Sequence, residues 1–161
     1  MSSSSVASID QKACTLAVAQ YAILGHHKRT EHWSILAVVS KTEAHVFQLK
    51  GNYDTFCYHH EIRTTYLGDH SLRGGFHAGT ISYSQLGWLK TRLAEVPVIR
   101  HDASFDSQTW VMECIRTLKD HGGIILPEIT ERKVRAEMEE ETERWEVADD
   151  IFFERLFNTS G

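Results

Sequence analysis

Apolar runs separated by short polar segments predict β-strands in the first half of the chain. The first run, residues 14–24, is rich in Ala and Val and long for a strand, so we interpret it as one strand with a helical turn. Residues 32–39 and 44–49 are joined by a short polar segment, a spacing typical of an antiparallel hairpin. Two further strands are expected, around 56–66 and at 77–81.

Apolar positions at three- and four-residue steps predict helices in the second half. The clearest helix covers residues 107–121, where one stripe is formed by Trp110, Val111, Cys114, Ile115 and Leu118. Asp106 is its expected N-cap, and the pair Gly122-Gly123 is its expected stop. The same spacing predicts a helix at 83–93. A charged outer helix is expected at 128–145, followed by an apolar segment, 151–157, that suits docking on the body or on a second chain.

Strands followed by helices predict an α+β fold with an antiparallel sheet. A chain of 161 residues has the length of one domain. We expect a disordered, serine-rich leader at 1–12, the α+β domain at 13–127 and an acidic helical extension at 128–161. The glycine-rich segment 68–75 is predicted to be a loop and is the best candidate for a lid.

Charge and cysteine usage narrow the class of protein. The formal net charge is −5, and residues 128–161 carry 11 acidic against 5 basic residues, so the body is almost neutral. This charge does not predict the basic surface that nucleic-acid binding requires. Three cysteines without a Cys-x-x-Cys pair favour reduced thiols in a cytoplasmic protein. No apolar run is long enough to predict a transmembrane segment.

Three positions fit the parts of a nucleophilic active site, which needs a nucleophile, a base and a group that orients the base. Ser107 lies in the first turn of the best helix, where the helix dipole and free N–H groups favour negative charge. His32 and His45 begin consecutive strands. Each residue alone has a simpler structural interpretation, because serine is common at helix starts and most strand histidines are only hydrogen-bonded.

The order of three short motifs adds a resemblance. His32-Trp33-Ser34-Ile35 opens a strand, His45-Val46-Phe47 follows a dozen residues later, and Asp106-Ser107-Gln108-Thr109-Trp110-Val111 starts the late helix. In this order the chain resembles the papain-like superfamily in the permuted arrangement of lecithin retinol acyltransferase and NlpC-type proteins. It is also similar to a group of small fungal proteins with the same run of motifs.

The resemblance implies a papain-like fold in which His32 is the base, His45 its orienting partner and Ser107 the nucleophile. Gln108 and Trp33 become candidates for oxyanion and substrate contacts, although Trp33 also suits a core position. The family carries a cysteine where this chain has Ser107. A thiol ionises near pH 8.5, whereas a serine needs a well-aligned base. Ser107 therefore marks a retuned serine hydrolase, a retired site that now binds something, or an engineered inactivation.

Three functions stay open at this point. The first is an acyl hydrolase or acyltransferase acting on an amide, ester or thioester; the second is a silent relative that binds a small molecule or peptide in the retained cleft. The third is an interaction protein that uses its acidic tail, and a homodimer through the C-terminal segment is a further expectation. No cofactor is expected, and neither His26-His27 nor residues 57–60 have zinc-site spacing. Cys57, beside two histidines, is a weaker candidate nucleophile.

Overall fold

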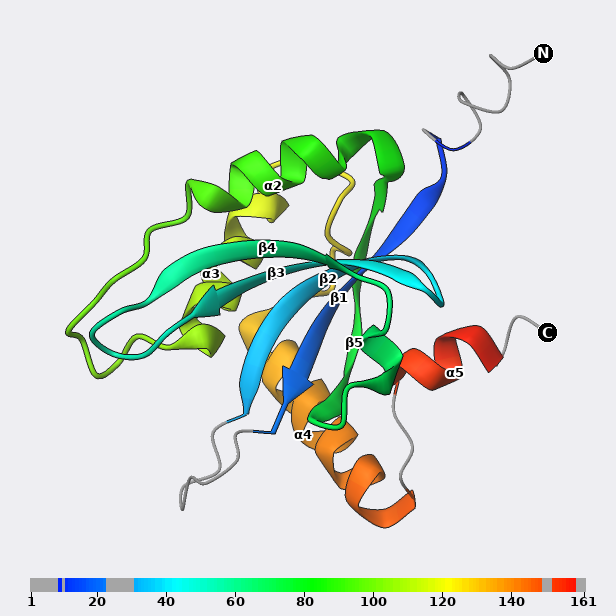
Figure 1. The fold of residues 1–161 in the computed structure, drawn as a ribbon. Coiled ribbons are helices and arrows are strands. Elements are labelled where there is room, and N and C mark those ends of the chain that lie inside the picture. The colour runs from blue at the N-terminus through cyan, green and yellow to red at the C-terminus, as the bar shows by residue number, and fades with distance from the viewer. Residues whose placement is uncertain (1–8, 10, 23–30, 149–151, 159–161) are drawn as a thin grey trace.

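Five antiparallel strands form the centre of the protein (Figure 1). The computed structural model describes residues 9, 11–22, 31–148 and 152–158, which form an α+β fold. The sheet order is β4-β3-β2-β1-β5. The strands are β1 (Ala13–Tyr21), β2 (His32–Ser40), β3 (Glu43–Lys50), β4 (Cys57–Arg63) and β5 (Leu72–Ser82).

The predicted hairpin at 32–39 and 44–49 is confirmed. Only Lys41 and Thr42 separate β2 from β3, and the register places Ile35 opposite Phe47 and Ala37 opposite His45. The run 14–24 forms β1 only as far as Tyr21, and the helical turn expected after it falls in residues 23–30, outside the described part of the chain.

The glycine-rich segment 68–75 is not one loop, and this corrects the lid prediction. Residues 72–75 already belong to β5, which therefore begins five residues before the predicted strand at 77. A Cβ atom on Gly75 would lie 2.1 Å from the carbonyl oxygen of Val18, so the strand needs glycine to approach β1 this closely. The composition that suggested a loop thus reflects close strand packing.

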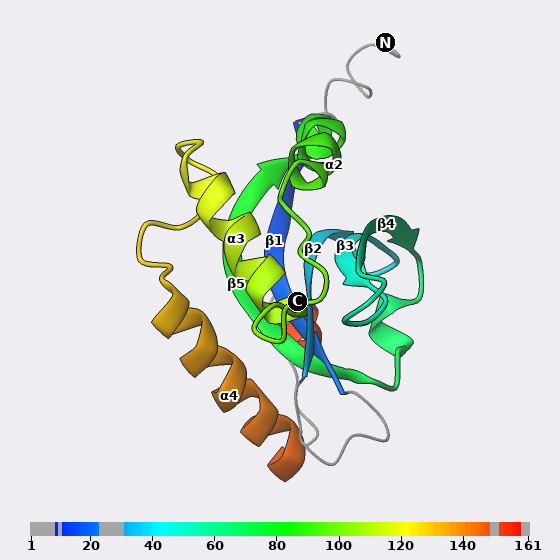
Figure 2. The same cartoon turned by 90° about the vertical axis from the view of Figure 1, so that its left-hand side faces the viewer.

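Three helices cover one face of the sheet and a short one covers the other (Figures 1 and 2). Helices α2 (Leu86–Ala94), α3 (Ser107–Lys119) and α4 (Glu131–Ala148) contribute to the larger apolar cluster, and α5 (Phe152–Asn158) to the smaller. The helices predicted at 83–93, 107–121 and 128–145 are confirmed with small shifts of their ends. No helix among the described residues has the length and apolar character needed to cross a membrane.

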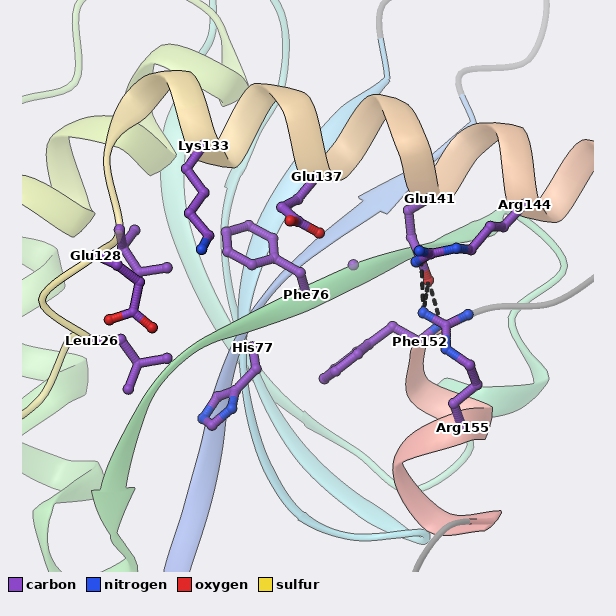
Figure 3. Close-up of a pocket in the computed structure, with 12 residues that line it drawn as sticks. Phe76, His77, Leu126, Glu128, Lys133, Glu137, Glu141, Arg144, Phe152 and Arg155 are labelled. Atoms are coloured by element: carbon purple, nitrogen blue, oxygen red, sulfur yellow. Dashed lines mark hydrogen bonds and ion pairs between the residues drawn. The ribbon is translucent and has the colours of Figure 1, made fainter.

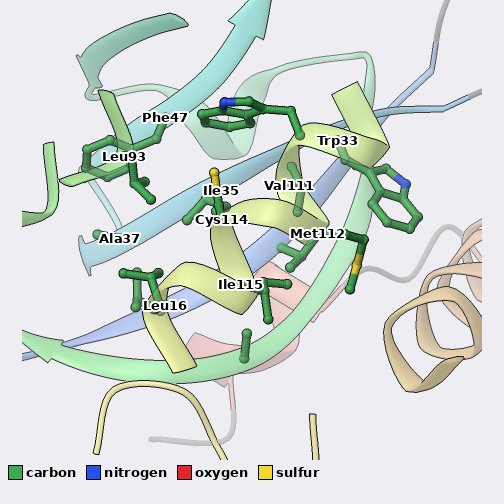
Figure 4. Packing of buried hydrophobic residues seen from close by; sticks show 14 of the residues in the cluster. Leu16, Trp33, Ile35, Ala37, Phe47, Leu93, Val111, Met112, Cys114 and Ile115 are labelled. Carbon is green, nitrogen blue, oxygen red and sulfur yellow. The ribbon is translucent and has the colours of Figure 1, made fainter. Parts of the chain in front are cut away.

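The main core lies between α3 and the sheet (Figure 4). Val111, Cys114 and Ile115 on α3 pack against Ile35 and Phe47 on the central strands. The apolar stripe predicted for this helix is the face that it buries, which is why the helix lies flat across β2 and β3.

The C-terminal region is part of the same body. Val134 and Met138 on α4 belong to the main core, and Phe153 on α5 is fully buried in the cluster on the opposite face. The apolar segment 151–157 was expected to dock on the body or on a second chain, and its described part packs on the body. The boundary expected at residue 127 is therefore not a break in the packing.

Candidate functional site

Ser107 begins α3, and its hydroxyl is used in packing. The Asp106 carboxylate accepts a hydrogen bond from the Thr109 N–H at 3.0 Å, and the Thr109 hydroxyl accepts one from the Asp106 N–H at 3.3 Å. The helix therefore starts where the cap was predicted. Ser107 is only 8% exposed, and its Oγ accepts a hydrogen bond from the backbone N–H of Trp33 at 3.1 Å. The hydroxyl thus connects α3 to β2.

The His32 ring lies on the other face of the sheet from α3. Trp33 packs in the main core with α3, and neighbouring strand residues point to opposite faces. The His32 ring accordingly lies near Tyr21, with 6.1 Å between ring centres, and its Nε2 is 3.0 Å from Oε1 of Gln48. Among the described residues no hydrogen bond joins His32 to Ser107, so the predicted base and nucleophile are not brought together.

Burial lowers the pKa of His32 below 6.5, although its hydrogen bond to Gln48 works in the other direction. The amide NH₂ of Gln48 donates to Oε1 of Glu61 at 3.3 Å. The carbonyl of Gln48 therefore accepts from His32, which assigns the ring proton to Nε2 and leaves Nδ1 as an acceptor. His32 is neutral at pH 7 and has a fixed orientation.

His45 is not the orienting partner of His32, and the strand register gives the reason. His45 pairs with Ala37, whose side chain is in the main core, so His45 and His32 point to opposite faces. His45 Nδ1 instead lies 3.0 Å from Nε2 of His60 on β4. Burial lowers the pKa of His45, against the raising effect of the nearby Glu43 carboxylate.

Gln48 holds the position beside His32 that the resemblance implied for His45. Val46 is opposite Leu36 in the hairpin, so Gln48, two residues further along β3, shares the face of His32. The period of two along the strand, combined with a fixed register, was the signal that could have identified it.

The His32 ring lines a hollow of about 310 Å³. Its lining residues come from strands β1 to β4, from the residue after β1 and from the segment before β5: Tyr21, Ala22, His32, Gln48, Arg63, Asp69 and Ser71. Arg63 connects the two ends of the hollow, because it donates to Glu61 at 2.8 Å and to Asp69 at 3.3 Å. Asp69 in turn accepts from the hydroxyl of Ser71 at 2.7 Å. A continuous hydrogen-bonded chain thus runs from the imidazole to Ser71.

The charges around the hollow leave it slightly negative. Burial favours protonation of Glu61, but hydrogen bonding and proximity to Arg63 lower the pKa of its carboxyl overall. With Arg63 positive, Glu61 and Asp69 negative and His32 neutral, the network sums to −1. Burial raises the pKa of Tyr21 to about 12, although the Ser34 hydroxyl beside it acts in the opposite sense. The wall of the hollow is therefore rich in acceptors and carries no unbalanced positive charge.

Gln108 and Trp33 line a separate groove of about 400 Å³ between the end of the sheet and α4. The NH₂ of Gln108 donates to the carbonyl of Glu31 at 2.9 Å, and its carbonyl accepts from Arg135 at 3.1 Å. The Arg135 guanidinium also lies 5.4 Å from the centre of the Trp33 ring, which is 3% exposed. Both residues predicted for substrate or oxyanion contacts are thus engaged in packing α3, α4 and β2 together.

A third hollow, of about 260 Å³, lies between α4, β5 and α5 (Figure 3). Glu141 closes one end of it and is only 1% exposed. Its carboxylate accepts from Arg144 at 3.0 Å, from Arg155 at 2.8 Å and from the N–H of Phe152. These contacts attach α5 to α4, so one acid of the charged outer helix predicted at 128–145 is a buried structural residue.

The remaining candidates do not form a second centre. Cys57 is exposed at the start of β4, and Cys114 is buried in the main core, where desolvation raises the pKa of its thiol. The described residues contain no group of three His, Cys, Asp or Glu side chains placed to hold a metal ion. His26 and His27 lie outside the described part of the chain.

Comparison with family models, with curated protein sequences and with solved structures finds no match.

Proposed function

We propose that this protein is a catalytically silent relative of the permuted papain-like proteins, and that it binds a small polar molecule in the hollow beside His32. The observation that carries the proposal is the separation of the two groups that acyl transfer needs. The Ser107 hydroxyl accepts from the Trp33 amide, and the His32 ring bonds to Gln48 on the other face. A base must come within about 3 Å of the proton that it removes.

The chemistry of the hollow favours a ligand with hydrogen-bond donors. His32 offers Nδ1 as an acceptor, Asp69 offers its carboxylate, and the guanidinium of Arg63 is already paired with two carboxylates. An amide or amine of a few heavy atoms suits this wall and this volume, whereas a carboxylate would face the net charge of −1. We therefore expect the ligand to present an amide or amine group to His32 and Asp69.

Titration with small probes tests the binding. Acetamide, methylammonium and acetate are similar in size and differ in charge and donors. Nitrogen–proton NMR spectra should show saturable shifts of the Gln48 side-chain amide with acetamide or methylammonium and no such shift with acetate. His32→Ala should abolish the response, while His70→Ala, at an exposed histidine, should keep it. Equal shifts with acetate, or no saturable shift with any probe, would contradict the proposed ligand class.

Labelling with a fluorophosphonate probe tests the absence of catalysis. Intact mass spectrometry should find no adduct on the wild-type chain, because the Ser107 hydroxyl accepts from the Trp33 amide and no described histidine bonds to it. An adduct that both Ser107→Ala and His32→Ala abolish would instead establish a serine hydrolase. The search for substrates among esters, amides and thioesters would then replace the search for a ligand.

A further inference from the structure

The two edges of the sheet differ, because another segment is hydrogen-bonded to one edge and none of the described segments to the other. On the β5 side, Thr80 N–H donates to the carbonyl of Ile124 and Leu126 N–H donates to the carbonyl of Ala78, each at 2.9 Å. Residues 124–126 thus cover that edge. On the β4 side, no described segment pairs with the outer edge, and the strand forms the margin of the fold (Figure 2). An outermost strand of this kind presents unpaired backbone N–H and C=O groups.

Strand β4 lacks a bulge, a proline and a lysine, which are three of the features that usually protect such an edge, although it carries Glu61 and Arg63. Its seven residues pair with β3 in one unbroken register, without a bulge that would twist the edge away. It contains neither proline nor lysine. Ile62, an apolar side chain near its end, is 56% exposed. The strand is therefore regular and accessible enough to receive another strand.

The sequence of β4 is complementary to itself in an antiparallel pairing centred on His60. In that register His59 of one copy lies opposite Glu61 of the other, and Tyr58 lies opposite Ile62. Opposite-charge pairs and aromatic–β-branched pairs are the favourable cross-strand combinations. The contacts that the structure gives Glu61 all use Oε1, so Oε2 remains for the second copy.

The placement of the acidic helix supports the same arrangement. Helix α4 packs on β5, at the opposite side of the sheet from β4. Two copies that meet through β4 keep these acidic helices far apart, which reduces the repulsion expected for a chain with a net charge of −5.

We propose that two copies of this chain associate through β4, antiparallel and centred on His60, so that their sheets form one continuous sheet. Each interface half then gains the backbone hydrogen bonds of a paired strand, one His59–Glu61 contact and cover for Ile62. The occupant of this edge is a second copy, because in this register His59 meets Glu61 and Tyr58 meets Ile62 on both sides of the centre.

Sedimentation equilibrium of the full chain over a range of concentrations tests the association. His59→Lys should strengthen the dimer, because lysine faces Glu61 of the other copy, and His59→Glu should weaken it. The dimer contains this pair twice, so each change should alter the association constant by about 2- to 30-fold. A wild-type chain that stays monomeric overturns the proposal. A monomer is also the result expected if the edge instead binds a strand of a different protein. A dimer that does not respond to residue 59 overturns it as well.

Disulfide cross-linking tests the register. With the exposed Cys57 changed to Ser, His60→Cys places two thiols opposite each other in the dimer, within the reach of a disulfide. Ile62→Cys is the matched control, because its two copies would be separated by about 14 Å along the strands. Mild oxidation should cross-link His60→Cys and not Ile62→Cys, with circular dichroism used to verify that both fold. Cross-linking in both variants, or in neither, overturns the proposed register.

Discussion

Ser107→Ala tests whether the Ser107 hydroxyl is a structural acceptor. The hydroxyl is buried and accepts one hydrogen bond, from the Trp33 N–H at 3.1 Å. Alanine keeps the helix start, which depends on Asp106 and Thr109, but leaves the Trp33 N–H without that partner. An unsatisfied buried donor costs about 1–3 kcal/mol, and we expect the free energy of unfolding to fall by that amount.

Urea unfolding followed by tryptophan fluorescence gives the required quantity. The midpoint should decrease while the slope stays constant, because the variant changes stability without changing the surface exposed on unfolding. For a domain of this size each kcal/mol corresponds to a decrease in Tm of about 2–4 °C. Ser107→Cys should fall between the wild type and Ser107→Ala, since sulfur is a weaker acceptor.

Ser104→Ala is the matched control. Its hydroxyl also makes a hydrogen bond, to Asp102 at 2.6 Å, but this bond is exposed to solvent. We expect the control to change stability by less than about 0.5 kcal/mol. If Ser107→Ala is as stable as the wild type, the Trp33 contact is not important for stability and the hydroxyl is available for chemistry.

Two further predictions concern stability. Gly75→Ala should destabilise the fold by about 3 kcal/mol or more, because the new Cβ would lie 2.1 Å from the Val18 carbonyl oxygen. Thermal unfolding measures this, and Gly87→Ala is the control. The Cβ added at Gly87 would have no neighbour within 4 Å, so this variant should be neutral or stabilising. Burial, and to a smaller extent the charge of the neighbouring His45, lowers the pKa of His60 from its ordinary 6.5 to about 4. Between these two pKa values the unfolded chain binds more protons than the folded one, so the free energy of unfolding decreases as the pH falls. Urea titrations at several pH values should show a smaller slope of stability against pH for His60→Gln. An unchanged slope would contradict the lowered pKa of His60.

The positions of strands and helices followed from local patterns in the sequence. The apolar stripe of α3 and the polar segment between β2 and β3 each identify an element without knowledge of its neighbours. The start of β5 did not follow, because glycines that allow two strands to approach closely have the same composition as a glycine-rich loop. Only the position of Val18 beside Gly75 distinguishes the two cases.

The candidate site could be predicted from the sequence only in part, for a different reason. The N-cap Asp106 and the first-turn position of Ser107 depend on local sequence, and both were predicted. The partners of His32 depend on which face of the sheet each side chain occupies, and a shift of one residue in register reverses every face. The resemblance implied His45 as the partner of His32, whereas the observed register places Gln48 there.

The burial of Phe153 also affects the order in which the protein can fold during synthesis. The strand residues that it covers, among them Ala17 and Leu36, leave the ribosome more than a hundred residues earlier. One face of the sheet can be completed when α3 and α4 emerge, but the other, where Tyr66 and Leu72 also pack, is not completed until α5 is made. The growing chain thus leaves part of an apolar sheet face exposed until the end of its synthesis, which makes nascent chains a natural target for chaperones that bind apolar surface.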